Sequence, residues 1–234
     1  MNNYMKIIAV IPARGGSKGV LKKNIRLLAD KPLIHYTINA AQHSNYIDHI
    51  IVSTDDDEIL NVSLMEGVQV IKRPPEIAGD KAPTIDAILH ALNHYNGPDI
   101  ESKLVVLLQP TSPFRTSSDI NAALDIFFQN DCDSVISVVE TTHPPYWNMV
   151  VNKSYLQPLF DQASLRKRRQ DLPKTYLPNG AIYIANAETL QQTHSFFTPK
   201  IKPYIMPAER SIDIDSEFDL LFAEALMKHG EDDD

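Results

Sequence analysis

Cysteine, long apolar runs and excess positive charge are all scarce in this sequence of 234 residues. The single cysteine, Cys132, has no internal disulfide partner, which favours a reducing compartment. Lys and Arg total 22 against 30 Asp and Glu, a formal net charge of −8, so phosphate-mediated binding to nucleic acid is not expected. The apolar runs are far shorter than a membrane span, and the first residues lack the layout of a signal peptide. We therefore expect a cytoplasmic protein with neither a nucleic-acid nor a membrane partner.

Short apolar runs alternate with segments of helical period along the chain. Four of these runs are predicted strands: residues 6–11, 50–54, 104–108 and 134–139. They are apolar throughout rather than alternating, which is typical of strands buried on both faces of a parallel sheet. Alternation of strands with helices predicts a three-layer α/β fold with right-handed crossovers, built as a single domain over residues 1–234.

Particular residue types mark the predicted helix starts. Pro32 is placed as a first-turn proline, Thr84 as a helix cap, and Thr116 as the start of a capping box with Asp119. The last predicted helix is capped by Ser216 and ends near residue 230. Its spacing predicts a buried stripe that consists of Phe218, Leu221, Phe222, Ala225 and Leu226.

The alternation breaks between about residues 140 and 176. This segment holds four prolines, the aromatic residues Tyr146 and Trp147, and a basic run at 166–169. We interpret it as an insertion on the core, of a kind that often forms subunit contacts. A long irregular lid is the alternative, and loops of this length are usually functional in either case.

The strongest chemical feature is the loop after the first strand, residues 11–24. Gly15, Gly16 and Gly19 are three of only eight glycines in the chain, and they leave backbone N–H groups open to an anion. Four basic residues surround them in an otherwise acidic chain: Arg14, Lys18, Lys22 and Lys23. The loop fits neither Walker A nor the dinucleotide fingerprint. It predicts a polyphosphate site at the carboxyl end of the first strand, with an ordinary glycine-rich turn as the alternative.

A pair of carboxylates precedes the last predicted helix. In an extended segment Asp213 and Asp215 share one face, while Ile212 and Ile214 pack behind them. Two neighbouring carboxylates repel unless a cation lies between them, and oxygen ligands with room for water and phosphate are typical of magnesium. The alternative is that Asp215 only helps to cap the helix.

Two turn-like segments supply further polar side chains. Gln109 ends a buried strand at the edge of the sheet where ligands of α/β proteins bind. Asn179, in the segment 178–183, is placed to meet a polar ligand. Because both segments are rich in residues that turns favour anyway, plain turn chemistry remains the alternative for each.

Together these motifs resemble the CMP–sialic acid synthetases, or N-acylneuraminate cytidylyltransferases, a family that includes CMP-legionaminic acid synthetases. The resemblance runs from about Ile7 to Leu226 and rests on motifs in the same order: 12–19 with 23–24, 53–55, 73–74, 109–113, Arg169, 178–183 and 211–215. It implies a Rossmann-like nucleotidyltransferase core, with a mainly parallel sheet, and a homodimer in which the inserted segment reaches the partner subunit. It also implies the reaction, in which CTP and a nonulosonic acid give a CMP-sugar and pyrophosphate, with Mg²⁺ required.

The resemblance further implies a role for each matching residue. The triphosphate would be held by Arg14, Gly15, Gly16, Ser17, Lys18, Lys23 and Asn24. The cytosine would be met by Arg73, Ala82 and Thr84, and the sugar by Gln109 and Asn179. Arg169 of the partner subunit would bind the sugar carboxylate, and Asp213 and Asp215 the metal. The catalytic residues implied are Arg14, Lys23, Asp213 and Asp215.

Physical chemistry agrees with this assignment. The sugar carries a carboxylate and its target a triphosphate, so charge repulsion opposes the in-line attack of the sugar 2-hydroxyl on the α-phosphorus. Arginine, lysine and Mg²⁺ around the phosphates offset that repulsion and stabilise the developing charge. The sequence offers no side chain with the character of a general base.

One departure from the family pattern concerns the sugar. Relatives often have a basic residue just after the His-Pro of the insertion, whereas this chain has His143-Pro-Pro-Tyr-Trp147. A larger and more apolar wall there suits a sugar with a deoxy position and extra N-acyl groups, such as legionaminic acid.

Other functions remain open from the sequence. One is a cytidylyltransferase for a different keto-deoxy sugar acid, such as an eight-carbon acid. Another is a metal-dependent glycosyltransferase, since Asp213-Ile-Asp215 also has the Asp-x-Asp pattern, although a diphosphate needs less positive charge than the loop provides. A nucleotide sensor without enzymatic activity is the third.

Overall fold

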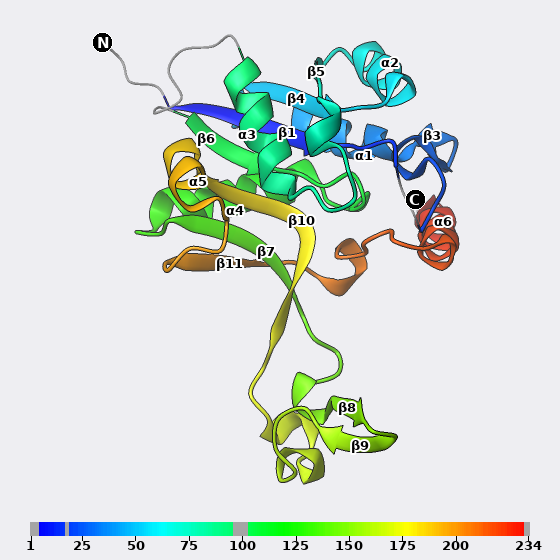
Figure 1. The fold of residues 1–234 in the computed structure, drawn as a ribbon, viewed down its shortest axis with the longest axis vertical. Helices are drawn as coiled ribbons and strands as arrows, with labels where there is room; N and C mark the ends of the chain where they lie inside the picture. Colours follow the sequence, from blue (N-terminus) through cyan, green and yellow to red (C-terminus); the bar gives the residue numbers. More distant parts are fainter. Residues whose placement is uncertain (1–4, 17–18, 96–102, 232–234) are drawn as a thin grey trace.

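The computed structural model describes residues 5–16, 19–95 and 103–231, and its core is a seven-stranded sheet of order β11-β7-β10-β6-β1-β4-β5 (Figure 1). The strands are β1 (Lys6–Pro12), β4 (His49–Thr54), β5 (Gln69–Lys72), β6 (Lys103–Leu107), β7 (Ser134–Glu140), β10 (Tyr176–Asn186) and β11 (Ile201–Ile205). Neighbouring strands run parallel, except that β10 is antiparallel to both β6 and β7. The predicted mainly parallel sheet is confirmed.

Helices cover both faces of the sheet. One face packs against α1 (Leu33–Gln42), α2 (Asp57–Met65) and α4 (Ser117–Gln129), and the other against α3 (Thr84–His94) and α5 (Ala187–Thr193). Alternate residues of β1 belong to the two resulting cores, Ile7 and Ala9 to the first and Ile8 and Val10 to the second. A strand between two helical layers must be apolar on both faces, which explains the continuous apolar runs.

Shorter elements complete the described part of the chain. A small hairpin joins β2 (Leu27–Leu28) to β3 (Lys31–Pro32), and 3-10 turns occur at η1 (Lys23–Ile25), η2 (Pro75–Ile77) and η7 (Ala208–Arg210). No helix within the three described ranges has both the length and the apolar character that crossing a membrane requires.

The predicted helix starts are partly right. Thr116 and Asp119 form a reciprocal capping box, as expected. Pro32 precedes α1 instead of lying in its first turn, because residues 31–32 pair with the short strand β2. Thr84 is the first residue of α3 and its side chain makes no capping bond, since Pro83 occupies the cap position.

The last helix, α6 (Glu217–Glu231), buries a different face from the one predicted. Leu220 and Ala223 pack on a small core with Ile214, whereas Phe218 and Leu221 are 75% and 63% exposed. Apolar residues occur around much of the helix, so periodicity alone could not indicate which side meets the core. Ser216 does accept the Asp219 N–H as a cap, and the helix ends at Glu231, close to the predicted end near residue 230.

Between β7 and β10 the chain leaves the core as an arm, residues 140–176 (Figure 1). The arm carries a hairpin of β8 (Met149–Asn152) and β9 (Tyr155–Pro158), together with η4 (Pro145–Trp147), η5 (Ser164–Arg166) and η6 (Arg169–Asp171). Lys153 and Ser154 form its two-residue turn with φ of 47° and 71°, the left-handed geometry of tight hairpins. The hairpin exposes large apolar side chains, with Val151 74% and Leu156 64% exposed.

Candidate active site

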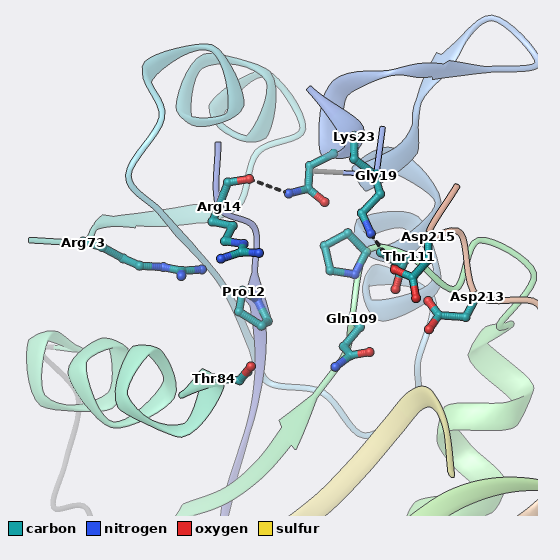
Figure 2. A pocket seen from close by; sticks show the side chains of 12 residues that line it. Pro12, Arg14, Gly19, Lys23, Arg73, Thr84, Gln109, Thr111, Asp213 and Asp215 are labelled. Carbon is teal, nitrogen blue, oxygen red and sulfur yellow. Dashed lines mark hydrogen bonds and ion pairs between the residues drawn. The ribbon is translucent and has the colours of Figure 1, made fainter. Parts of the chain in front are cut away.

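A cavity of about 520 Å³ lies at the carboxyl edge of the parallel strands (Figure 2). Its walls come from the segments after β1, β5 and β6, the start of α3 and the segment before α6. They consist of Pro12, Arg14, Gly19, Lys23, Asn24, Arg73, Thr84, Gln109, Pro110, Thr111, Asp213 and Asp215. Motifs far apart in the sequence therefore meet in one place.

Polar contacts with neighbouring segments hold the loop after β1 in place. Asp55, which follows β4, accepts the Gly15 N–H at 3.0 Å, and the buried Asn24 amide donates to the Arg14 carbonyl at 2.9 Å. The Arg14 guanidinium reaches the cavity and pairs with Asp80 at 3.0 Å. Gly16 is exposed, with open space around its Cα. The predicted site residues Ser17 and Lys18 lie outside the described residues.

The glycine loop, residues 11–24, touches the acidic segment, residues 211–215, directly. Lys23 Nζ lies 2.9 Å from Asp215 Oδ1, between residues 192 apart in sequence. Gly19 packs against the backbone of Asp215, where a Cβ would overlap the Asp215 carbonyl oxygen. Only glycine permits this approach, so the cationic loop and the carboxylates share one wall of the cavity (Figure 2).

Asp213 and Asp215 both line the cavity, as the sequence predicted for a shared face. Ile214 is fully buried between them, and its N–H donates to the Thr111 carbonyl at 2.9 Å. Asp213 Oδ1 is buried without a hydrogen-bond partner. Burial raises the pKa of Asp213 above its ordinary value, and the charge of Asp215 acts in the same direction.

The chemistry of this pair fits a divalent cation. An unsatisfied buried carboxylate oxygen beside a second carboxylate supplies the hard oxygen ligands that Mg²⁺ prefers. Within the described ranges, no third acidic residue, histidine or cysteine completes a cluster. The other ligands would therefore be water and phosphate oxygens, which Mg²⁺ usually retains.

The opposite wall carries Arg73 and Thr84 (Figure 2). Arg73 follows β5 and is largely buried. Its guanidinium donates to the Ser53 carbonyl at 2.7 Å and to the Ser53 hydroxyl at 3.0 Å, and these bonds compensate for the loss of contact with water. Burial lowers the pKa of Arg73, and the nearby charge of Arg14 adds to that effect. Thr84 is exposed at the start of α3. Ala82 does not line the cavity.

Gln109 and Asn179 lie differently from each other. Gln109 follows β6, lines the cavity and lies against Gly180, whose φ of +77° favours glycine. Asn179 is only 5% exposed and does not line the cavity. Its amide accepts from Ser137 at 2.6 Å and donates to Ser211 at 2.9 Å, so its side chain ties β10 to β7 and to the acidic segment.

Arg169 lies on the arm and is not among the residues that line the cavity. Its guanidinium is within 3.6 Å of Glu140, which also pairs with Lys174 at 2.9 Å. These three side chains lie around a second cavity of about 430 Å³ at the base of the arm. Within one chain the structure does not bring Arg169 together with the other predicted site residues.

Several residues at the site were missed by sequence reasoning. Thr111 and Asp80 were not singled out, since isolated polar residues in turns carry no pattern. Tyr183 packs against Phe196 and Phe197 with ring centroids 5.7 and 6.5 Å apart. Burial raises the pKa of Tyr183, and the charge of Asp213 acts in the same direction. The adjacent aromatics of residues 196–197, between α5 and β11, were the available signal.

Comparison with known protein families and sequences identifies relatives of this chain. The family model for cytidylyltransferases matches residues 8–229. An N-acylneuraminate cytidylyltransferase of Streptococcus agalactiae serotype III is 40% identical over 222 residues, covering 93% of this chain and 52% of that protein. The chain thus spans about half the length of the first curated relatives that it matches.

Shorter relatives match over nearly their whole length. A CMP-N,N'-diacetyllegionaminic acid synthase of Legionella pneumophila is 37% identical, covering 96% of this chain and 97% of that protein. A solved structure of a CMP:2-keto-3-deoxy-manno-octonic acid synthetase complexed with CTP superposes with a TM-score of 0.71 at 17% identity, covering 96% of this chain and 99% of that one, which shows the fold alone. The sequence matches show that this chain belongs to the cytidylyltransferase family.

Proposed function

We propose that this chain transfers a cytidylyl group from CTP to a nonulosonic acid and releases pyrophosphate. The observation that carries the proposal is one cavity in which a cationic glycine loop and the Asp213–Asp215 pair are in contact. Relatives named for N-acylneuraminate, diacetyllegionaminate and pseudaminate support the substrate class.

The residues of the loop bind and orient the triphosphate. Arg14 and Lys23 face the cavity and, in this structure, pair with Asp80 and Asp215. Triphosphate oxygens would take over these cations, because phosphate carries more negative charge than one carboxylate. The Gly16 N–H would add a further donor to the same anion, whereas the Gly15 N–H is already bound to Asp55. The resemblance assigns the same role to Ser17 and Lys18, which lie outside the described residues.

Asp213 and Asp215 would hold Mg²⁺, whose ligand preference their unsatisfied oxygen matches. The bound ion would neutralise phosphate charge and stabilise the charge that develops on in-line attack. The protein's own part is to hold these carboxylates and Lys23 on one wall of the cavity. There the ion and the lysine would both offset the negative charge of the triphosphate, which otherwise repels the sugar carboxylate, and so allow the sugar hydroxyl to approach the α-phosphorus.

Substrate groups other than the triphosphate are assigned by position around the cavity. Arg73 and Thr84, with Ala82 beside them, lie on the wall away from the acidic pair and would receive the cytosine. Gln109 lies on the wall near Gly180 and would receive the sugar. Asn179 supports that subsite from behind through Ser211, and a direct bond to the sugar requires its amide to turn.

We propose a homodimer in which the arm of one subunit completes the site of the other. The apolar residues Val151 and Leu156 of the hairpin are exposed among the described residues, which favours their burial against a second copy. Arg169 of the partner subunit would then bind the sugar carboxylate. A cytoplasmic location, where CTP is available, stays a prediction.

The identity of the sugar is tied to the arm. Tyr146 packs against Phe160 with ring centroids 5.4 Å apart, and the four residues after His143 include two aromatic residues and no basic one. We propose a legionaminate-type acid with extra N-acyl groups as the preferred substrate.

The test is pyrophosphate release from CTP and Mg²⁺ with four acids compared: N-acetylneuraminic, diacetyllegionaminic and pseudaminic acids, and the eight-carbon keto-deoxy acid. Fastest release with diacetyllegionaminic acid is expected. Preference for another nine-carbon acid would contradict the sugar assignment alone. No release with any of the four, from folded protein that binds CTP, would overturn the proposed acceptor class.

A further inference from the structure

The N terminus of α4 carries a buried carboxylate with more partners than a helix cap needs. Asp119 is 1% exposed, and its Oδ2 accepts the Thr116 N–H at 2.9 Å to complete the capping box. The same carboxylate also accepts from Arg210, with Nη2 2.9 Å from Oδ1 and Nε 3.1 Å from Oδ2, and from the Tyr204 hydroxyl at 2.7 Å. The capping box explains only the first of these contacts.

Arg210 lies at the point where the chain enters the acidic segment. It ends η7, and the next residues, 211–215, have no regular secondary structure. Their position therefore depends on individual contacts with the core. Ser211 is tied to Asn179 and the Ile214 N–H to the Thr111 carbonyl, but Arg210 provides the only charged contact among these three.

The charge state of Asp119 favours a strong contact. Burial alone would raise the pKa of its carboxyl, but the hydrogen bonds from Arg210, Thr116 and Tyr204 together hold it below the ordinary value. Asp119 is therefore ionised at neutral pH, and its paired bonds to a planar guanidinium resist both sliding and rotation. Such geometry fixes a direction as well as a distance.

We propose that Asp119 and Arg210 are positioning residues, whose ion pair holds the segment with Asp213 and Asp215 against Lys23 and so sets the affinity of the carboxylates for a divalent cation. This inference rests on the proposed metal role of the two aspartates. Neither Asp119 nor Arg210 lines the cavity, so both act through the segment and not on the substrate.

The test uses Arg210→Gln and Arg210→Lys, with Thr116→Val as the matched control. Mn²⁺ is titrated into the protein without nucleotide, because CTP itself binds Mn²⁺, and free Mn²⁺ is followed by electron paramagnetic resonance. Arg210→Gln is expected to weaken Mn²⁺ binding by about 10-fold, the lower end of the effect of losing a direct partner of a metal ligand, because Arg210 acts on the two aspartates only through their segment. Arg210→Lys keeps the charge and is expected to be intermediate. Thr116→Val removes the cap hydroxyl and its 2.8 Å bond to Asp119 Oδ2 but leaves the Arg210 contact in place, so its melting temperature is expected to fall while Mn²⁺ binding does not change.

Kinetics separate positioning from general support. Arg210→Gln is expected to lower kcat and raise the Mg²⁺ concentration needed for half-maximal rate, with little change in KM for the sugar acid. Wild-type Mn²⁺ affinity in Arg210→Gln would overturn the inference, whatever its melting temperature. If that variant does not fold, unchanged affinity in Arg210→Lys has the same meaning. Absence of Mn²⁺ binding by the wild-type protein would instead overturn the metal role itself, and this inference with it.

Discussion

The cavity and the arm differ in how their side chains are supported. Around the cavity, buried polar side chains hold the loops in place through hydrogen bonds, as Asn24 does for the glycine loop by donating to the Arg14 carbonyl. Arg115, fully buried, donates to the Ala181 carbonyl at 2.9 Å and to the Gln109 carbonyl at 3.2 Å, and so braces two more segments of the wall. On the arm, by contrast, the hairpin presents Val151, Tyr155 and Leu156 to solvent.

This difference indicates which part of the site is complete within one chain. Loops that buried polar groups hold in place would be preorganised for the proposed nucleotide, because little rearrangement would be needed on binding. The exposed apolar residues of the arm favour its burial against a second copy of the chain, as proposed above. We therefore expect nucleotide chemistry to depend on the core and sugar selection to depend on assembly.

The largest effect is expected inside the cavity. Asp213→Asn and Asp215→Asn should each lower Mg²⁺-dependent turnover by about 10²–10³-fold, because each removes charge that holds the ion at the phosphates. Pyrophosphate release measures the loss, and circular dichroism should show an unchanged fold. Full activity in either variant would contradict the proposal that these two aspartates bind the metal ion.

A charge on the arm should affect assembly and spare the core. Val151→Asp combined with Leu156→Asp is expected to convert dimer to monomer in analytical ultracentrifugation and to abolish turnover, while CTP binding persists. Met65→Asp is the matched control, because Met65 is equally exposed but lies on α2 of the core. A dimer that survives the double change would contradict the role given to the hairpin.

Mixed subunits should show whether the arm works across the dimer. Arg169→Ala is expected to raise KM for the sugar acid, and Asp213→Asn to be inactive. Exchanging equal amounts of the two should restore about a quarter of wild-type activity, because half the dimers are mixed and one of their two sites is intact. No recovery, with subunit exchange verified, would mean that Arg169 does not act on the partner's site.

Removing the buried cation of Arg115 should lower the free energy of unfolding, whereas removing the exposed cation of Arg26 should not. Arg115→Met leaves the Gln109 and Ala181 carbonyls without their donor and should lower the free energy of unfolding by about 3 kcal/mol. Arg26→Met, half-exposed and 3.8 Å from Glu217, should change it by less than about 0.5 kcal/mol. Urea unfolding compares them, and equal losses would show that burial is not what matters.

The smallest effect concerns Asp213 and pH. Its folded-state pKa is raised, so ionisation costs stability as pH rises above the unfolded value. In EDTA, Asp213→Asn should therefore be slightly more stable than wild type at pH 7, and this advantage should vanish as pH falls below about 4. Melting temperatures across that range provide the measurement. A destabilised variant at neutral pH would show that the ionised carboxylate has a favourable partner.

Local sequence signals predicted much of the fold. Continuous apolar runs identified four strands of the sheet, and the Thr116–Asp119 spacing identified the start of α4, because both depend on neighbouring residues alone. The pairing of Asp213 with Asp215 on one wall also followed from two-residue spacing. Helix faces were less predictable, since α6 has apolar residues on more than one side and its buried face depends on what lies beside it.

The sequence by itself determined which chemical groups this protein has and their order: buried strands, a cationic glycine loop and an acidic pair. Only the tertiary structure decided that Lys23 meets Asp215, that Asp119 pairs with Arg210 and that Arg169 lies away from the cavity of its own chain. The reason is physical. Strand burial and caps follow from interactions between near neighbours, whereas these contacts join residues that come together only when the sheet and its helices pack.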